Sequence, residues 1–347
     1  MPELHAAPEL NPRSPTTALL RLVTGNWVSQ SIYVVAKLGI ADLLRDRAKT
    51  AEELAQETKT HPDALHRILR MLARVGVFTE HDDHRFGLTP VGACLQTGVP
   101  GSLKAFSVAM GEELYHAWGD ALHSVQTGTS AFEHVFGMGP FEYRATRPES
   151  AAVFNQAMTE MSVEAGKAIL DAYDFSQFNR VVDIGGGYGL FLIRLLQTHP
   201  HLSGVLFELP YVASGATERI NKAGLMDRCR IAAGDFFADA LPEGFDAYIL
   251  KNVVDSFDTS RMEALLSRCR QIMPPNAKLL IIGWVIRRTN ALGLGDLLDT
   301  HFLVALSGRV RTEVEYEGLF AKSGLKIGRI IPTNSTTGES ILECVPT

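Results

Sequence analysis

The sequence predicts an α/β protein in which a mostly helical N-terminal half precedes a parallel sheet. After residue 177, short apolar runs alternate with helical patterns, as they do in successive βα units. Before that point, apolar residues recur at helical spacing. Hydrophobic residues make up 46% of the 347 residues and charged residues 21%, which is typical of a globular protein with a sizeable core. A chain of this length suggests about two domains.

We expect the chain to divide into four segments. Its first residues are rich in proline and lack an apolar signal core, which predicts disorder and no secretion signal. The segments are a disordered leader (1–16), a winged-helix domain (17–100), a helical linking region (101–176) and a sheet domain (177–347).

The winged-helix prediction follows from start and stop signals. Thr50 and Glu53 match a capping box, in which each side chain satisfies a free backbone donor at the start of a helix. Pro62 fits the first turn of a second helix, and Gly76 fits the position just past its end. Residues 77–89 are predicted to form a hairpin. Helix, helix and hairpin follow one another in a winged-helix domain.

A winged helix also raises the hypothesis of DNA binding, because Arg67, Arg70 and Arg74 lie on the candidate recognition helix. However, residues 1–100 contain 11 Lys/Arg and 11 Asp/Glu, whereas a DNA-binding domain should show a basic surplus. We therefore expect a scaffold or dimerisation module and no nucleic-acid partner. The helices of residues 19–44 are more apolar than a lone domain needs, which favours burial by a second copy and predicts a homodimer.

Composition excludes several other classes. The net charge of −6 gives no general attraction to nucleic acid or to anionic membranes. Apolar stretches fall far short of the ~18 residues that a membrane-spanning helix needs. The four cysteines form no Cys-x-x-Cys pair, so we expect no metal site and no disulfide framework, and a cytoplasmic location.

The strand over residues 180–184 leads into a glycine turn and then a helix. Glycines allow a ligand to approach the backbone closely, and the helix start supplies free N–H donors. The glycines of this turn (Gly185, Gly187 and Gly189) do not have the spacing of the dinucleotide pattern. Asp183 precedes them and suits a cofactor with an amino group better than a pyrophosphate. Its alternative role is to cap the following helix.

The next strands also end in residues that can bind a nucleoside. Glu208 can accept two hydrogen bonds from a ribose diol. Asp235 and Phe236 can bind the edge and face of an adenine, although Asp235 is alternatively an ordinary loop acid. Lys251 ends the fourth strand. Ligands bind at the carboxyl ends of such strands, so glycines, acids, an aromatic and a lysine are predicted to meet there.

These segments resemble the class I S-adenosylmethionine-dependent methyltransferases, through VVDIGGGYG, GVLFELP, GDFF and YILKNVV. The nearer resemblance is to the small-molecule O-methyltransferases of plants and bacterial natural-product pathways, with the bacterial phenazine-type enzymes nearest. It extends over nearly the whole chain, from about Leu19 to Val345. It implies a Rossmann-like sheet domain, an N-terminal winged-helix dimerisation domain and a helical region that covers the substrate.

The resemblance also implies roles for individual residues. Gly185 and Gly187 would line the methionine part of S-adenosylmethionine, and Glu208 would hold its ribose. Further contacts with the cofactor are implied for Asp235, Phe236, Lys251, Met158 and Ser162.

Many family members carry a His-Asp-x-x-Asp segment whose histidine removes the proton of the substrate hydroxyl. The matching stretch here runs from Asp255 to Asp258 and contains no histidine. Asp255 is therefore one candidate base, and it is alternatively a cap for a helix beginning near Thr259 or a loop acid. His301 is the second candidate. Methyl transfer from a sulfonium uses a neutral leaving group, so positioning can supply much of the rate and a base is not essential.

The sequence thus predicts a methyltransferase acting on a hydroxyl, or a ring nitrogen, of a small aromatic or polycyclic secondary metabolite. The missing histidine leaves open an enzyme that uses the cofactor for decarboxylation, hydroxylation or a pericyclic step. A winged-helix transcription regulator and a nicotinamide dehydrogenase are further alternatives, and the glycine spacing argues against the dehydrogenase.

Overall fold

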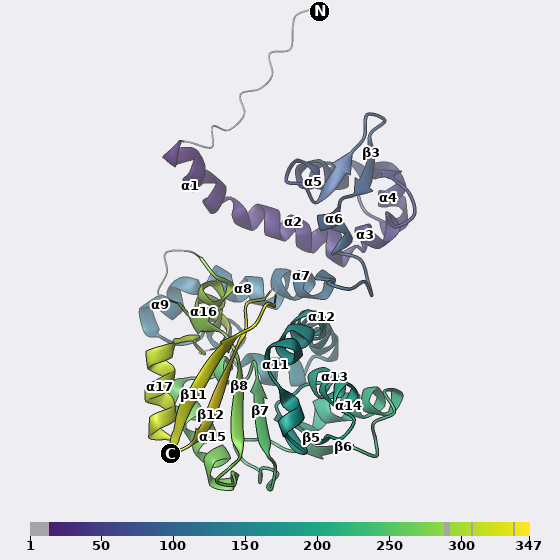
Figure 1. Ribbon diagram of the computed structural model, residues 1–347. Helices are drawn as coiled ribbons and strands as arrows, with labels where there is room; N and C mark the ends of the chain where they lie inside the picture. Colours follow the sequence, from purple (N-terminus) through teal and green to yellow (C-terminus); the bar gives the residue numbers. More distant parts are fainter. Residues whose placement is uncertain (1–13, 288–291, 307, 336) are drawn as a thin grey trace, which may run out of the picture. The chain divides into compact units, whose positions relative to one another are not determined.

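The computed structural model describes residues 14–287, 292–306, 308–335 and 337–347 (Figure 1). The chain forms two compact units, which meet in sequence between Gly111 and Glu112. No helix within the described residues has the length and apolar character needed to cross a membrane.

The first unit contains the predicted helix, helix and hairpin. Thr50 and Glu53 form the expected capping box, with the Thr50 amide donating to Glu53 Oε2 at 2.7 Å and the Glu53 amide donating to Thr50 Oγ1 at 3.2 Å. The three short strands form an antiparallel sheet in the order β1-β3-β2. Its elements are α1 (Pro15–Val23), α2 (Gly25–Lys37), α3 (Ile40–Leu43), β1 (Lys49–Thr50), α4 (Ala51–Thr58), α5 (Pro62–Arg74), β2 (Phe78–Glu80), β3 (Arg85–Leu88), α6 (Pro90–Ala93) and α7 (Lys104–Gly111).

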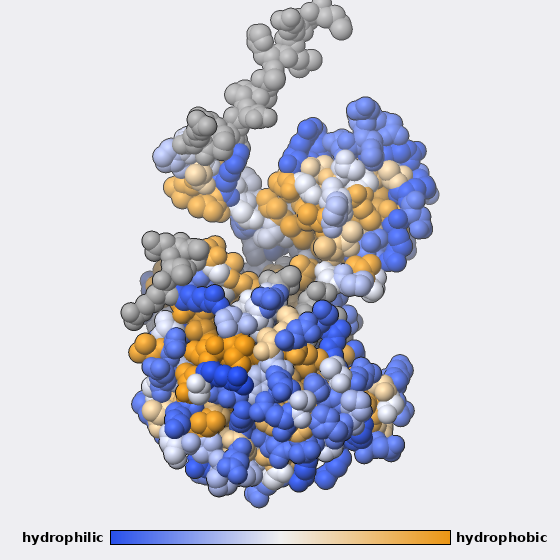
Figure 2. Space-filling view, viewed as in Figure 1, coloured by the Kyte–Doolittle hydropathy of each residue, from blue (hydrophilic) through white to orange (hydrophobic). Residues whose placement is uncertain are grey.

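The helix α7 belongs to this unit, because it packs closely on α2. A Cβ atom added to Gly111 would collide with the ring of Tyr33. By contrast, α1 buries none of its residues within the unit. Its side chains Leu19, Leu22 and Val23 are mostly exposed, and hydrophobic (orange) atoms are visible at the surface in the region of that helix (Figure 2).

The second unit begins with helices and continues as a seven-stranded sheet. The leading helices are α8 (Glu113–Gly119), α9 (Ala121–Thr127), α10 (Ala131–Phe136), α11 (Pro140–Ala145) and the long α12 (Pro148–Ala172). A 3₁₀ turn at Phe175–Gln177 leads into the sheet. The strands are β4 (Arg180–Ile184), β5 (Ser203–Glu208), β6 (Cys229–Ala233), β7 (Ala247–Lys251), β8 (Lys278–Gly283), β11 (Leu325–Pro332) and β12 (Ser340–Pro346).

The strand order is β11-β12-β8-β7-β4-β5-β6, with β4 to β8 parallel and β12 antiparallel to both of its neighbours. From β4 the chain builds outward to β5 and β6, and then returns to place β7 on the other side of β4. The strand order therefore reverses between β4 and β7, and sheets of this kind bind ligands at the carboxyl ends of the strands beside such a reversal. The predicted α/β fold, with a helical N-terminal domain before a Rossmann-like sheet, is confirmed.

Alternate residues of each strand enter two separate cores, as the period of a strand requires. Val182, Ile184 and Leu250 face a cluster with residues of α15 (Thr259–Ile272) and α17 (Glu313–Lys322). Val181 and Ile249 face a second cluster with residues of α12, α13 (Leu190–Thr198) and α14 (Pro210–Lys222). The remaining elements are β9 (Val285–Ile286), β10 (Arg311–Thr312), α16 (Leu294–Ala305) and a 3₁₀ turn at Val254–Ser256.

Candidate functional site

The glycine turn after β4 has room for a ligand on one side and none on the other. Gly185 and Gly187 have φ of 73° and 60°, a region that favours glycine. A Cβ atom on Gly186 would collide with the Asp183 carboxylate, and one on Gly185 would lie 2.9 Å from Val253. At Gly187 nothing lies within 4 Å of that position. A ligand can therefore approach the backbone at Gly187.

Asp183 is fully buried beneath this turn, and neither carboxylate oxygen has a hydrogen-bond partner. Burial raises its pKa to about 7, while nearby Lys251 opposes the rise and Glu208 adds to it. The alternative of a helix cap is wrong, because α13 is preceded by Gly189 and receives no side-chain cap. A buried acid without a partner is rare. It fits a cofactor that carries a positive charge.

Glu208, at the end of β5, is joined to the glycine turn by its carboxylate. The Gly187 amide donates to Oε2 at 2.9 Å, and the Leu209 amide donates to Oε1 at 2.7 Å. Burial raises the pKa of this carboxyl. Each oxygen has a further lone pair. The carboxylate can therefore accept hydrogen bonds from a ribose diol while it holds the turn in place.

The segment after β6 brings an aromatic ring to the same turn. A Cβ atom on Gly185 would lie 3.4 Å from the Phe236 ring. The loop is fixed by Asp235, whose Oδ1 accepts from the Phe237 amide at 2.8 Å, and by Asp239, whose Oδ2 accepts from the Asp235 amide at 2.8 Å. Asp235 thus shapes this loop. The structure brings Phe236 and Gly185 together, as an adenosine site at the strand ends requires.

Lys251, at the end of β7, joins the sheet to α12. Its Nζ donates to Ser162 Oγ at 3.2 Å, and burial lowers its pKa. Met158 precedes Ser162 by four residues, so both lie on one side of α12. Asn252, next along the chain, was not singled out from the sequence. It has a positive φ of 57°, and its Oδ1 is buried without a partner, so it is a further candidate to contact a ligand.

Asp255 is 1% exposed and is held by Tyr316, whose hydroxyl donates to Oδ1 at 2.5 Å. Burial raises the pKa of Asp255 to about 6. The helix α15 is capped by Asp258, which accepts from the Arg261 amide at 2.9 Å, so the alternative that Asp255 caps this helix is wrong. The described contacts tie Asp255 to the packing of α17. Its role as a base stays a prediction.

His301, on α16, accepts a hydrogen bond at Nδ1 from the indole N–H of Trp118 on α8, at 3.1 Å. The centroids of the two rings lie 6.3 Å apart, with an angle of 18° between the ring planes. Burial, with the charge of Arg144, lowers the pKa of His301 to about 4, so the ring is neutral at pH 7. A neutral ring that accepts at Nδ1 carries its proton on Nε2. His301 is therefore arranged as a hydrogen-bond donor at Nε2, with its basic lone pair already occupied.

A group of acidic and histidine side chains and a cavity lie outside the site described above. Asp120, His123 and His134 could hold a metal ion, but the two imidazoles are parallel, with centroids 3.9 Å apart and planes within 5°. One ion cannot lie in both ring planes, and His134 already pairs with Asp120 at 2.6 Å. This arrangement is a close contact between Asp120 and His134, with the ring of His123 stacked on His134.

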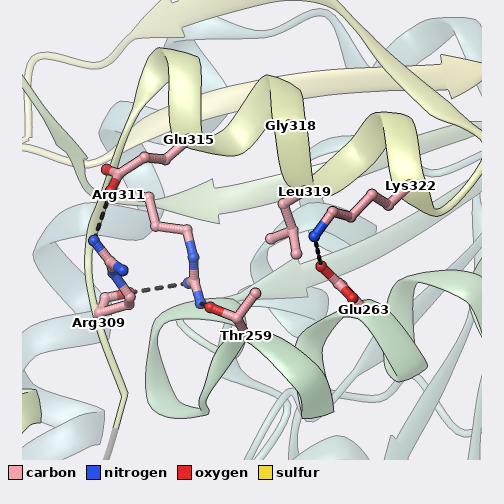
Figure 3. Close-up of a pocket in the computed structure, with 8 residues that line it drawn as sticks. All are labelled: Thr259, Glu263, Arg309, Arg311, Glu315, Gly318, Leu319 and Lys322. Atoms are coloured by element: carbon pink, nitrogen blue, oxygen red, sulfur yellow. Dashed lines mark hydrogen bonds and ion pairs between the residues drawn. The ribbon is translucent and has the colours of Figure 1, made fainter. Parts of the chain in front are cut away.

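A cavity of about 230 Å³ lies between α15 and α17 (Figure 3). Its charged side chains pair with one another: Lys322 with Glu263 at 2.8 Å and Arg309 with Glu315 at 2.6 Å. Arg311 donates to the Arg309 carbonyl oxygen at 3.1 Å. The lining residues come from α15, α17 and the segment before α17, and they include none of the predicted cofactor-binding residues. The cavity therefore gives no indication of the cofactor.

Comparison with known proteins identifies the family. Residues 115–326 match the O-methyltransferase domain, and residues 20–98 match the O-methyltransferase dimerisation domain. A phenazine O-methyltransferase, PhzM of Lysobacter antibioticus, is 44% identical over 95% of this chain and 96% of its own length. The crystal structure of LaPhzM is 44% identical, with a TM-score of 0.92, over 96% of this chain and all of that one.

A second solved structure contains ligands. NcsB1, an O-methyltransferase of neocarzinostatin biosynthesis, was solved with S-adenosylhomocysteine and 1,4-dihydroxy-2-naphthoic acid. It is 30% identical, with a TM-score of 0.80, over 92% of this chain and 96% of its own. The open glycine turn, the unpartnered Asp183 and the carboxylate of Glu208 fit such a cofactor. The chain belongs to the O-methyltransferase family and is an S-adenosylmethionine-dependent methyltransferase.

Proposed function

We propose that this enzyme methylates a hydroxyl group of a small aromatic or polycyclic secondary metabolite, with a ring nitrogen as the alternative acceptor. The observation that carries the proposal is the glycine turn after β4, where the space beside Gly187 is open and the Gly187 amide donates to Glu208 at the end of β5. One of the relatives described above is a phenazine O-methyltransferase, and the other was solved with 1,4-dihydroxy-2-naphthoic acid. Because they are methyltransferases, they favour methyl transfer over the non-methylating alternative.

Each predicted cofactor contact has a chemical role in this proposal. The bound cofactor supplies a methyl group that is activated on a sulfonium. Gly185 and Gly187 line its methionine part, Glu208 accepts from the ribose hydroxyls, and Phe236 packs on the adenine, with Asp235 holding its loop. Lys251 and Ser162 fix α12 beside the cofactor, and Met158 lies one turn away on the same helix.

The acceptor is held by the helices above the sheet. His301 donates from Nε2 to the acceptor oxygen and so aligns one of its lone pairs with the methyl group. Asp255 is 1% exposed and is held by Tyr316; in this proposal the acceptor hydroxyl reacts as its anion, so no side chain of the site needs to take its proton. The rate then comes mainly from positioning, which can lower a barrier by ~7–11 kcal/mol.

We also propose that two copies pair through the first unit, over residues 17–100, while residues 101–176 cover the substrate and 177–347 hold the cofactor. Leu22 and Trp27 are 79% and 68% exposed, and the dimerisation family matches this part of the chain. A Leu22→Asp, Trp27→Asp double variant should elute as a monomer in size-exclusion chromatography with light scattering. Val125→Asp, a change at an exposed apolar residue of α9, is the control. A double variant that remains dimeric would contradict this assignment.

The remaining proposal is a cytoplasmic location. Cys229, Cys269 and Cys344 are free and buried, and Cys94 is free and partly buried, which suits a reducing compartment.

The central experiment incubates the enzyme with labelled S-adenosylmethionine and a panel of phenols, hydroxynaphthoic acids and phenazines. Mass spectrometry should find one methylated product for each S-adenosylhomocysteine formed. A product that has changed without gaining a methyl group would instead support the non-methylating alternative.

A further inference from the structure

Arg144, in the last turn of α11, is a buried cation with an incomplete set of partners. It is 4% exposed, and its Nε donates to Glu113 Oε1 at 3.2 Å. Glu113 is itself 6% exposed and also accepts from Ser150 Oγ at 2.9 Å. The guanidinium carbon lies 3.6 Å from the centroid of the Phe154 ring. One edge and one face of the guanidinium are therefore fixed.

Both terminal nitrogens of Arg144 are buried without a hydrogen-bond partner. A buried polar group in this state is destabilising, and native proteins rarely retain one without a reason. Since Nε is occupied by Glu113, the free donors are those of Nη1 and Nη2, at the end of the guanidinium. These two nitrogens can donate two parallel hydrogen bonds to one ligand group.

The position of Arg144 is linked to the glycine turn after β4 through α12. Phe154, beneath the guanidinium, is followed by Asn155, whose Nδ2 donates to the Tyr188 hydroxyl at 3.0 Å. Tyr188 stands in the glycine turn, directly after Gly187. The positive charge of Arg144 therefore lies two contacts away from the turn that faces the cofactor.

The positive charge of Arg144 also shifts the pKa of two other side chains of the second unit. It lowers the pKa of His301, the proposed donor to the acceptor oxygen, and it opposes the rise in the pKa of Tyr211, in the first turn of α14. Tyr211 comes three residues after Glu208. The charge of Arg144 therefore acts on both His301 and Tyr211, without a direct contact to either being described.

We propose that Nη1 and Nη2 of Arg144 bind a carboxylate in the active site. The inference rests on the proposed function. A guanidinium that offers two parallel N–H groups matches the two oxygens of a carboxylate, and such charge-assisted pairs are the strongest of the common hydrogen bonds. Two molecules in this site can carry that group: the cofactor, through its methionine carboxylate, or an aromatic acid acting as the methyl acceptor.

Glu113 has a defined part in this arrangement. It neutralises the buried guanidinium before any ligand arrives, and it orients the guanidinium so that the terminal nitrogens stay free. Arg144 is then preorganised, and binding needs no rearrangement of its long side chain.

The test compares ligands that differ only in the part bearing the carboxylate, in the full-length protein and its Arg144→Gln variant. Calorimetry measures the Kd of S-adenosylhomocysteine and of 5′-methylthioadenosine, which lacks the amino-acid end. If the cofactor supplies the carboxylate, the variant binds S-adenosylhomocysteine at least tenfold more weakly and 5′-methylthioadenosine as well as the wild type does. The same comparison is made with 1,4-dihydroxy-2-naphthoic acid and 1,4-dihydroxynaphthalene. If the acceptor supplies it, only the affinity for the acid falls.

The matched control is Arg147→Gln, because Arg147 also lies over an aromatic ring, Tyr143, at 3.8 Å but is exposed. It should leave all four affinities unchanged. If the Arg144→Gln variant does not fold, the same test is made with Arg144→Lys. Lysine keeps the positive charge but lacks the paired N–H groups, so we expect a smaller loss of affinity for the same ligand.

The proposal is overturned if folded Arg144 variants lose affinity equally for both members of each pair, or for neither. In that case Arg144 only supports the packing of α11 and α12. Failure of the wild type to bind S-adenosylhomocysteine would instead remove the proposed function itself, and this inference with it.

Discussion

Replacing Glu208 by alanine tests the cofactor site most directly, because this carboxylate is expected to join the ribose to the glycine turn. A hydrogen bond to a charged group contributes about 1.5–3 kcal/mol. Losing the equivalent of one such bond to the ribose weakens binding ~10–150-fold. We therefore expect the Kd of S-adenosylhomocysteine, measured by calorimetry, to rise at least ~10-fold. The variant should also melt at a lower temperature, because the Gly187 and Leu209 amides lose their acceptor.

The pH dependence gives an independent check on the same residue. Burial raises the pKa of Glu208 above its ordinary value of 4.5. The ionised form is the one that accepts from both ribose hydroxyls. Affinity should therefore be complete above the raised pKa and fall as the pH drops through it, whereas Glu208→Gln should lack this dependence. Glu218→Ala, which removes an exposed carboxylate from α14, is the control. A Glu208→Ala variant with a Kd within threefold of the wild type would refute the assignment.

Three further predictions concern buried polar groups of the second unit. Because the pKa of Asp183 is raised to about 7, the cofactor-free protein should lose stability as the pH rises from about 4 to 7, by roughly 2–4 kcal/mol. Asp183→Asn should reduce the difference in stability between pH 5 and pH 8 in urea denaturation, leaving the part due to Asp255, and an unchanged pH dependence would contradict it. His301→Ala should lower kcat by ~10-fold or more through loss of a hydrogen-bond donor. The wild-type profile of kcat/KM against pH should show no change between pH 6 and 8 that reflects titration of a histidine. A titration in that range that the variant lacks would instead assign His301 as the base. Asp255→Asn should lower the melting temperature, as Tyr316→Phe does, with less than a threefold change in kcat; a tenfold fall in kcat at unchanged stability would assign Asp255 as the base.

Local signals in the sequence were sufficient for the elements that carry the site. The capping box at Thr50 and Glu53 defined the start of α4, because each partner lies within one helical turn of the other. The glycines after β4 predicted a turn, and the structure adds that Gly185, Gly187 and Gly189 have positive φ. The convergence of Glu208 on that turn followed from the common edge of parallel strands, so Gly187 and Glu208 were expected to be neighbours although they are 21 residues apart.

Side-chain partners from distant elements could not be predicted in this way. Asp255 contacts Tyr316 61 residues later, and Arg144 contacts Glu113 31 residues earlier. No periodicity or motif links such pairs, because they depend on how one helix packs against another. For the same reason the sequence identified His301 as a possible base, while the occupation of its lone pair by Trp118 became apparent only in three dimensions.

The hydrogen bond between Trp118 and His301 has a consequence for which molecules this enzyme can alkylate. An imidazole whose lone pair already accepts a hydrogen bond cannot deprotonate the methyl acceptor. The acceptor hydroxyl must therefore be ionised before methyl transfer. An ordinary phenol, with a pKa of about 10, is almost entirely protonated at neutral pH. Compounds whose ring withdraws electrons from the hydroxyl lose that proton far more easily. The enzyme's selectivity should therefore rank otherwise similar compounds by the acidity of the group that receives the methyl.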